Sequence, residues 1–354
     1  MIPVPPTIAD DVTELAPGLW LIRTPLPGHS VGSLNSYLIA GNDRAAVVDT
    51  PWGTPDVISA FAARIAATGL SPSEIGQVLV THCHEDHSGA AGWLHEQHGS
   101  EVVMSARDHA ALGRRFGAGQ AELTAELADW LDGIGADADA DAYEYAFDQQ
   151  RDLFSRQYAI PPARHVKDGD TVRVGQEWSL DVVETPGHTP GHLCFVERRR
   201  GLVFAGDHVF RRRRGNAVAR PPAPHRPIAA YWHSMAKVRA TGADTVLPGH
   251  GEPFTGLGPR AEELMTVRAR KRAEVVRLTA EPTTAWAVAQ RMQRRTGWQE
   301  LNGNARLAAA GEALAYLLDA RDAGLVTGTT STPRLWKNTP AAVNLRNDRR
   351  DHGA

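Results

Sequence analysis

The segment 81–89, THCHEDHSG, contains four side chains that can bind a metal ion: His82, His84, Asp86 and His87. It directly follows the apolar run QVLV, which predicts a buried strand, and it leads into a predicted helix. His82 and His84 share a side if the backbone stays extended, and the second pair lies beyond them. This spacing differs from the i, i+4 histidine pair of the HExxH proteases. The segment can therefore contribute to two metal ions, one for each pair.

The same pattern, a short apolar β-run with a His or Asp at its end, recurs along the chain. It is found in AAVVDT, LDVVETPGH, LVFAGD and DTVLPGH, whose metal-capable residues are Asp49, His188, Asp207 and His250. In an α/β domain the ends of neighbouring strands meet at one edge of the sheet, where ligand sites usually lie. The sequence therefore predicts one site that is built from five separate segments.

These residues suffice for a dinuclear metal centre. Five His and two Asp give three side chains for each ion and one bridging carboxylate. Each ion would keep an open position for water, as catalytic zinc does. Two divalent ions, two carboxylates and a bridging hydroxide leave about one positive charge, which would stabilise a developing oxyanion. Imidazole and carboxylate ligands without a thiolate favour two Zn²⁺ ions, with Mn or Fe as alternatives.

The motifs THCHEDHSG, TPGHTPGH, FAGDH and LPGHG, in this order, resemble those of the metallo-β-lactamase superfamily, and VVDT resembles its first motif. The resemblance covers about residues 15–258 and implies an αββα sandwich with a dinuclear site between the sheets. It implies that one metal is bound by His82, His84 and His188. It implies that the other is bound by Asp86, His87 and His250. Asp207 would bridge the two ions, and Asp49 would orient a ligand.

Strand-like runs that alternate with helical patterns predict an α/β catalytic domain, to which helical segments are added. The predicted catalytic domain spans residues 1–258 and includes an Ala-rich helical insert at about 106–165. Residues 259–332 contain three helical patterns and a short strand-like run, AGLVTG. They resemble the winged-helix-like C-terminal domain of one hydrolase branch, whose members include thioesterases and a ribonuclease. Residues 333–354 are polar without a period, so we expect a flexible tail.

Composition narrows the class of protein. The 354 residues are 42% hydrophobic and 22% charged, which is typical of a soluble globular protein of about two domains. No apolar run reaches the roughly 18 residues of a membrane helix, and the first residues lack the features of a signal peptide. The net charge of −3 argues against a protein whose main task is to bind nucleic acid. Two cysteines, Cys83 and Cys194, make no disulfide framework, so we expect the reducing cytoplasm.

Charge is distributed unevenly along the chain. Residues 121–152 hold ten acidic residues against one Arg, and residues 198–226 hold nine Arg. Such runs are usually solvated surfaces. The alternatives are a lid or homodimer contact for the acidic run and binding of an anionic group for the arginines, because guanidinium pairs well with carboxylate and phosphate. The candidate substrate-binding residues are Trp52, Arg211, Arg212, Arg213, Arg214 and His225. Cys83, His192 and His208 adjoin the predicted ligands, but we do not expect them to bind metal.

Three functions compete for this site. The favoured one is a zinc-dependent hydrolase in which a metal-bridging hydroxide attacks the carbonyl of a thioester or ester with an anionic group. Asp86 and Asp49 are the candidate catalytic residues, and the partner would be a small-molecule or carrier-linked acyl substrate. A ribonuclease or phosphodiesterase would use the same ions, which the Arg-rich run favours and the net charge disfavours. A mononuclear iron oxygenase of the same fold is disfavoured by the two-metal ligand set.

Overall fold

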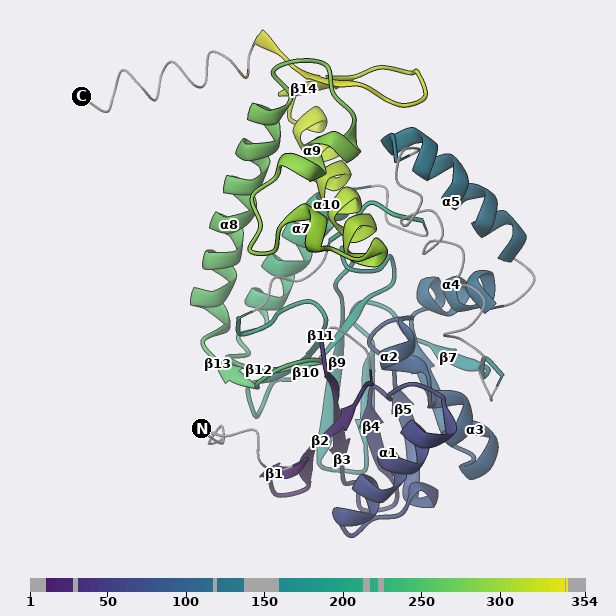
Figure 1. Cartoon of the computed structure of the whole chain (residues 1–354). Helices are drawn as coiled ribbons and strands as arrows, with labels where there is room; N and C mark the ends of the chain where they lie inside the picture. Colours follow the sequence, from purple (N-terminus) through teal and green to yellow (C-terminus); the bar gives the residue numbers. More distant parts are fainter. Residues whose placement is uncertain are drawn as a thin grey trace. The chain divides into compact units, whose positions relative to one another are not determined.

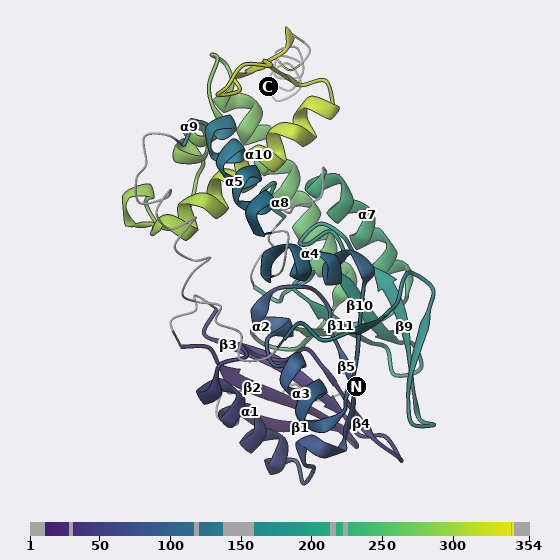
Figure 2. The same ribbon diagram turned by 90° about the vertical axis from the view of Figure 1, so that its right-hand side faces the viewer.

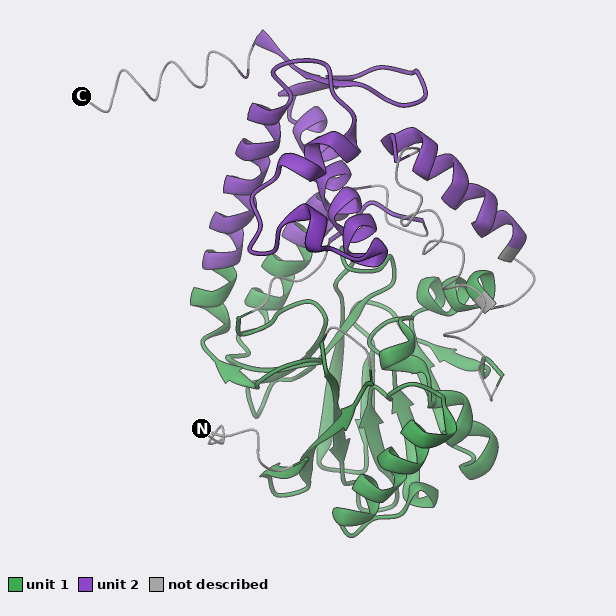
Figure 3. Ribbon diagram, in the orientation of Figure 1, with its two compact units in different colours: residues 1–118, 155–215, 233–262 green, residues 119–154, 216–232, 263–354 purple. Residues whose placement is uncertain are grey.

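The computed structural model of the chain divides into two compact units (Figure 3). It describes residues 11–27, 31–116, 120–136, 159–212, 217–221, 226–340 and 342. The first unit comprises residues 1–118, 155–215 and 233–262. The second unit comprises residues 119–154, 216–232 and 263–354. Helices α7 (Pro227–Ala240) and α8 (Leu257–Leu278) contribute residues to both units.

A seven-stranded sheet in the first unit has the order β1-β2-β3-β4-β5-β6-β7 (Figure 1). Its strands are β1 (Val12–Ala16), β2 (Leu19–Pro25), β3 (Ser33–Ile39), β4 (Ala45–Val48), β5 (Ile75–Leu79), β6 (Glu101–Met104) and β7 (Ala163–His165). The first four strands pair antiparallel and the last four pair parallel. Parallel neighbours need a crossover connection, which α1 (Pro55–Ala67) and α3 (Ala91–His98) supply.

A six-stranded second sheet in the same unit has the order β13-β12-β11-β10-β9-β8. Its strands are β8 (Thr171–Val174), β9 (Trp178–Glu184), β10 (Leu193–Glu197), β11 (Leu202–Gly206), β12 (Thr245–Pro248) and β13 (Phe254–Thr255). All pairings are antiparallel except that of β11 with β12, which α7 connects. The two sheets therefore each contain a βαβ crossover. The residues that follow β5, β9, β11 and β12 form the site described below.

Strand β4 shows how the two sheets and the helices share the core. Its sequence AAVV is buried at every position. Ala46 and Val48 belong to the cluster between the sheets, which includes the edge-to-face pair Tyr37 and Phe204 at 5.5 Å between ring centroids. Ala45 and Val47 belong to a second cluster that includes residues of α1 and α3. A strand that is buried on both faces reads as a continuous apolar run. The predicted α/β sandwich is confirmed.

Helix α1 shows why the predicted helices form where they do. Pro55 occupies the first helical position, where its missing N–H has no cost and its fixed φ suits the helix. The buried residues Val57, Phe61 and Ile65 recur every four positions, so they lie on one face. In Figures 1 and 2, α1 and α3 lie along the first sheet, and α3 contacts β5 and β6. This layer covers the strands that lead into the site.

The second unit is mostly helical. It contains α5 (Gln120–Ile134), most of α8, α9 (Ala285–Arg291) and α10 (Gly303–Asp322), with a short 3₁₀ turn at Trp298–Glu300. The side chains of Thr284 and Asn302 cap α9 and α10 by accepting backbone hydrogen bonds. Strands β14 (Val326–Gly328) and β15 (Trp336–Asn338) pair antiparallel. The three predicted helices are present, and the winged-helix description stays a prediction.

Several predicted boundaries differ from the structure. The helical insert predicted at about 106–165 ends inside strand β7, and its helices α4 (Ala106–Phe116) and α5 belong to different units. Its acidic part beyond residue 136 lies outside the described residues, as do residues 343–354. The segment predicted as a tail contains β15, where Trp336 is fully buried. Three-residue strands such as β7 and β15 are too short to show a period in the sequence.

Among the described residues, no helix has the length and apolar character that crossing a membrane requires.

Candidate metal centre

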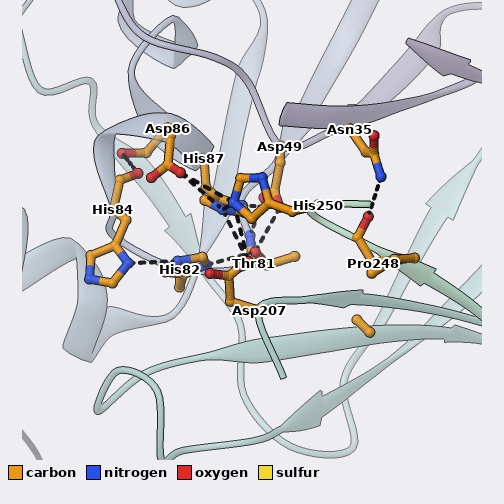
Figure 4. Close-up of polar contacts among 12 residues, drawn as sticks. Asn35, Asp49, Thr81, His82, His84, Asp86, His87, Asp207, Pro248 and His250 are labelled. Carbon is orange, nitrogen blue, oxygen red and sulfur yellow. Dashed lines mark hydrogen bonds and ion pairs between the residues drawn. The ribbon is translucent and has the colours of Figure 1, made fainter. Parts of the chain in front are cut away.

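The structure brings all seven predicted metal ligands together in the first unit. Figure 4 shows six of them: His82, His84, Asp86, His87, Asp207 and His250. His82 and His84 follow β5, and the short helix α2 (Glu85–Ser88) carries Asp86 and His87. The other three ligands each follow a strand of the second sheet: His188 after β9, Asp207 after β11 and His250 after β12. The carboxyl ends of strands from two sheets thus meet at one place, as ligand sites in α/β folds commonly do.

The first group of ligand atoms comes from three histidines. Nδ1 of His84 lies 3.0 Å from Nε2 of His82 and 3.0 Å from Nε2 of His188. All three nitrogens lie within 4.8 Å of one another. Nitrogens bound about 2.0–2.1 Å from one tetrahedral zinc ion would lie about 3.3 Å apart. The three rings therefore converge as the ligands of a single ion do.

The second group combines a carboxylate with two histidines. Nε2 of His250 lies 3.2 Å from Oδ2 of Asp86 and 3.1 Å from Nε2 of His87. The distance between Asp86 Oδ2 and His87 Nε2 is 3.7 Å. All three residues are buried. This is a second set of three donors within reach of one ion.

Asp207 lies between the two groups. Its Oδ1 is 3.3 Å from Nε2 of His87 and 3.5 Å from Nε2 of His250, whereas its Oδ2 is 3.4 Å from Nε2 of His188. Oδ1 is buried and makes no hydrogen bond of good geometry within the described part of the chain. A buried carboxylate oxygen without such a donor is costly unless a cation meets it. The donor set thus fits divalent metal binding, and Asp207 lies within reach of both groups.

The pKa shifts differ between the histidines of the two groups. Burial lowers the pKa of His82 well below its ordinary value and that of His84 to about 3, so both rings are neutral at pH 7. Burial acts in the same direction on His87 and His250, but nearby carboxylates, above all Asp207, raise the pKa of both. Neutral imidazoles offer a lone pair to a metal, and the carboxylates attract positive charge to the second group.

Comparison with known proteins agrees with the motifs. A family model described as the metallo-beta-lactamase superfamily matches residues 8–250. The chain belongs to the metallo-beta-lactamase superfamily. It is 26% identical over 291 residues to the probable metallo-hydrolase YqjP of Bacillus subtilis, which covers 77% of this chain and 83% of that protein. It is 29% identical over 230 residues to the acyl-coenzyme A thioesterase MBLAC2 of Gallus gallus, which covers 62% of this chain and 73% of that protein.

The fold of this superfamily member also matches a solved structure nearly throughout. A crystal structure of a metallo-beta-lactamase family protein from Thermus thermophilus superposes with a TM-score of 0.77 and 26% identity. The match covers 92% of this chain and 100% of that chain. It therefore includes most of the C-terminal helical region, beyond the residues that the family model matches. Family and relatives together support a hydrolase.

Asp49, in the segment VVDT, connects Thr81 and His87 through hydrogen bonds. Its Oδ1 accepts a hydrogen bond from the backbone N–H of Thr81 at 2.7 Å, and its Oδ2 accepts one from the Thr81 hydroxyl at 2.8 Å. Nδ1–H of His87 donates to the same Oδ2 at 2.8 Å, which leaves Nε2 of His87 to bind metal. The φ of Asp49 is 61°, a left-handed conformation that costs free energy outside glycine. Asp49 therefore fixes the orientation of the His87 ring.

His250 is held by β3, which sequence reasoning did not associate with the site. Nδ1–H of His250 donates to the carbonyl of Ser33 at 2.7 Å. The amide of Asn35 donates to the carbonyl of Pro248 at 3.0 Å (Figure 4). It also donates to the carbonyl of Gly251 at 2.7 Å, so the two acceptors lie on either side of His250 in the sequence. The sequence did contain an indication of this contact. Ser33 and Asn35 are polar residues at alternate positions of β3, so their side chains lie on one face of the strand.

Residues that adjoin the ligands do not enter the ligand groups of the described chain. His192 accepts a hydrogen bond from the backbone N–H of Asp207 at 3.2 Å, so it holds the segment that carries the Asp207 carboxylate. His208 is fully buried. Cys83 is partly buried beside the helix-side core, and burial raises the pKa of its thiol well above the ordinary value. The thiolate form that binds metals is thereby disfavoured.

The substrate-binding candidates are less defined by the structure. Trp52 is half-buried and follows Asp49 by three residues. Arg211 and Arg212 are exposed on the segment that follows Asp207. Arg213, Arg214 and His225 lie outside the described residues. A substrate role for these residues stays a prediction.

Proposed function

We propose that this chain is a dinuclear zinc-dependent hydrolase that acts on a thioester or ester with an anionic group. The observation that carries the proposal is the position of Asp207. Its Oδ1 lies 3.3 Å from Nε2 of His87 in the second group, and its Oδ2 lies 3.4 Å from Nε2 of His188 in the first group. Asp207 also forms a third, overlapping set of possible ligands with His82 and His87. The name of one relative, an acyl-coenzyme A thioesterase, supports the acyl substrate class. The exposed Arg211 and Arg212, a few residues beyond Asp207, support an anionic group. The carrier of the acyl group would be coenzyme A or a protein.

The chain's own residues divide the work of such a reaction. Two ions bound at these groups would activate a water molecule at neutral pH and polarise the carbonyl of the substrate. His82 and His87 are held with Nε2 directed to the centre, because Thr81 and Asp49 take up their Nδ1 atoms. The arrangement therefore requires little reorganisation when the substrate binds.

Asp86 is the residue proposed to move the proton. Burial favours its neutral form, but the charge of His87 and the hydrogen bond from His250 outweigh this and lower its pKa below the ordinary range. It is therefore a carboxylate at neutral pH and can accept the proton of the attacking water. Its side chain is 12% exposed, whereas that of Asp49 is 3% exposed, so Asp86 is the more accessible of the two candidate catalytic carboxylates. The same proton would then pass to the departing thiolate or alkoxide.

The proposal is tested by metal analysis coupled to a substrate panel. The purified full chain is assayed for bound metals and for hydrolysis of an acyl-coenzyme A, an acylglutathione, an aryl ester, a lactone, a phosphodiester and RNA. We expect about two metal ions per chain and the largest kcat/KM on a thioester. Asp170→Asn, which alters an acceptor of the Lys167 backbone N–H, is the matched control and should behave as wild type. Wild-type turnover with less than one metal per chain, or hydrolysis of RNA alone, would contradict the proposal.

A further inference from the structure

We propose that Asp108, in the first turn of α4, is a positioning residue of the metal centre. Its carboxylate fixes the two loops that carry His82, His84 and His188. The inference rests on the metal binding proposed above. No sequence motif pointed to Asp108, because it lies in the segment that was predicted to be an insert.

The carboxylate of Asp108 accepts hydrogen bonds on both oxygens. Oδ2 accepts from the backbone N–H of Cys83 at 3.0 Å and from the hydroxyl of Thr189 at 2.6 Å. Oδ1 accepts from the backbone N–H of Gly191 at 2.6 Å. Asp108 is 1% exposed, and burial raises its pKa above the ordinary value. A buried carboxylate is costly, so three donors are needed to offset its desolvation.

The donors to Asp108 adjoin the ligands of the first group. Cys83 lies between His82 and His84, and Thr189 directly follows His188. The Cys83 loop follows β5 of the first sheet, and the Thr189 loop follows β9 of the second sheet. One carboxylate therefore joins two segments that no strand pairing connects, at the points where they present their ligands. A shift of either loop would change the distances among the three ligand nitrogens.

The surroundings of Asp108 leave little freedom. Its own backbone N–H donates to Oγ of Ser105 at 3.2 Å. A Cβ atom at Gly191 would lie 2.1 Å from that Oγ and 2.7 Å from Oδ1 of Asp108, so the loop can approach this closely only as glycine. The link is thus a close-packed contact in which the carboxylate cannot easily exchange its partners.

Asp108 corresponds in its arrangement to Asp49. Asp49 links the Thr81 backbone to His87 of the second group, and Asp108 links the Cys83 backbone to the His188 loop of the first group. Two buried carboxylates from different segments thus hold the two ligand groups in separate ways. A change at Asp108 should therefore affect the two ions unequally.

The test compares Asp108→Asn with the wild type and with Asp170→Asn as the matched control. Asn has the size of Asp, but its NH₂ group would face a donor whichever way the amide is turned. We expect one of the two Zn²⁺ ions to bind about 10–100-fold more weakly in a chelator competition, the range typical of residues that orient metal ligands. In Co²⁺-loaded protein, the visible absorption of one ion should change and that of the other should stay, because the spectrum reports coordination geometry.

Thr189→Val serves as a second variant if Asp108→Asn does not fold. It removes a single hydrogen bond to the carboxylate, and we expect the same ion to be weakened by a smaller factor, with kcat lowered more than KM. Unchanged affinity for both ions and an unchanged Co²⁺ spectrum in either folded variant would overturn the proposal. A lowered Tm with unchanged metal affinity would also overturn it, since the link would then be only structural. A wild type that binds no divalent metal would instead contradict the proposed function.

Discussion

The two compact units differ in how many of their charged side chains are buried. In the first unit many ionisable groups are buried, among them Asp49, Asp86, Asp108, His82, His87 and His250. In the second unit, Arg268 is the only buried charged side chain within the described ranges, and it stacks on Tyr231 at 3.6 Å from the ring centroid. Some other charges there form pairs at the surface, such as Arg226 with Asp322. Burying ionisable groups costs folding free energy, so their concentration in the first unit indicates a functional site. In the second unit the charged side chains stay largely at the surface, where ion pairs contribute little to stability.

The largest expected effect comes from removing the bridging carboxylate. Asp207→Ala should lower kcat/KM more than about 100-fold and reduce the metal content, because both ligand groups lose a shared oxygen. The fold should persist, since the change removes a buried charge without a good hydrogen-bond donor to Oδ1. Circular dichroism and metal analysis are the measurements. Wild-type metal content in this variant would contradict the view that the buried charges of the first unit serve metal binding.

Metal removal should have the next largest effect. Treatment with a chelator should abolish hydrolysis, and added Zn²⁺ should restore it. A ligand present at 100 times its dissociation constant stabilises a fold by about 2.7 kcal/mol, so the Tm should fall measurably on removal. Proteolysis during chelation should locate the loosened segments, and we expect cleavage in the first unit. Preferential cleavage in the second unit would contradict the assignment of metal binding to the first unit.

Asn35→Ala should have an intermediate effect. It removes both hydrogen bonds to the carbonyls that flank His250, so we expect about 10–100-fold weaker binding of one ion and a cost of about 1–3 kcal/mol in the free energy of unfolding. Ser36→Ala is the matched control, because the neighbouring Ser36 is buried and its hydroxyl has no hydrogen-bond partner among the described residues. Equal metal affinity in both variants, measured by chelator competition, would refute the role of β3.

The smallest effect is expected in the second unit. The hydrogen bond and charge of Arg226 lower the pKa of Asp322 from its usual 3.8. The pair therefore stabilises the fold above about pH 3.8, and this stabilisation is lost as the pH falls through the lowered pKa. Asp322→Asn should lower the Tm by about 2 °C or less at pH 7, with no difference at sufficiently acid pH and unchanged kcat/KM. A clear fall in kcat/KM at a temperature where the variant remains folded would show that this unit takes part in catalysis.

The sequence predicts the fold and the ligands of the centre because both depend on local patterns. Apolar strands that end in His or Asp can be recognised without knowing what packs against them. Asn35 and Asp108 could not be assigned, because their partners lie 213 to 216 and 25 to 83 residues away in the sequence. Their role consists of hydrogen bonds to backbone atoms, which leave no motif. The strand that contains Trp336 was missed for a related reason, since three residues show no period.

The most direct test of the account is X-ray diffraction from crystals grown with Zn²⁺, measured at the zinc absorption edge. We expect two anomalous peaks about 3.5–4 Å apart, the spacing of two-metal sites, with one oxygen of Asp207 directed at each. One peak would lie among His82, His84 and His188, and the other among Asp86, His87 and His250. A single peak, or two peaks that Asp207 does not join, would contradict the dinuclear centre.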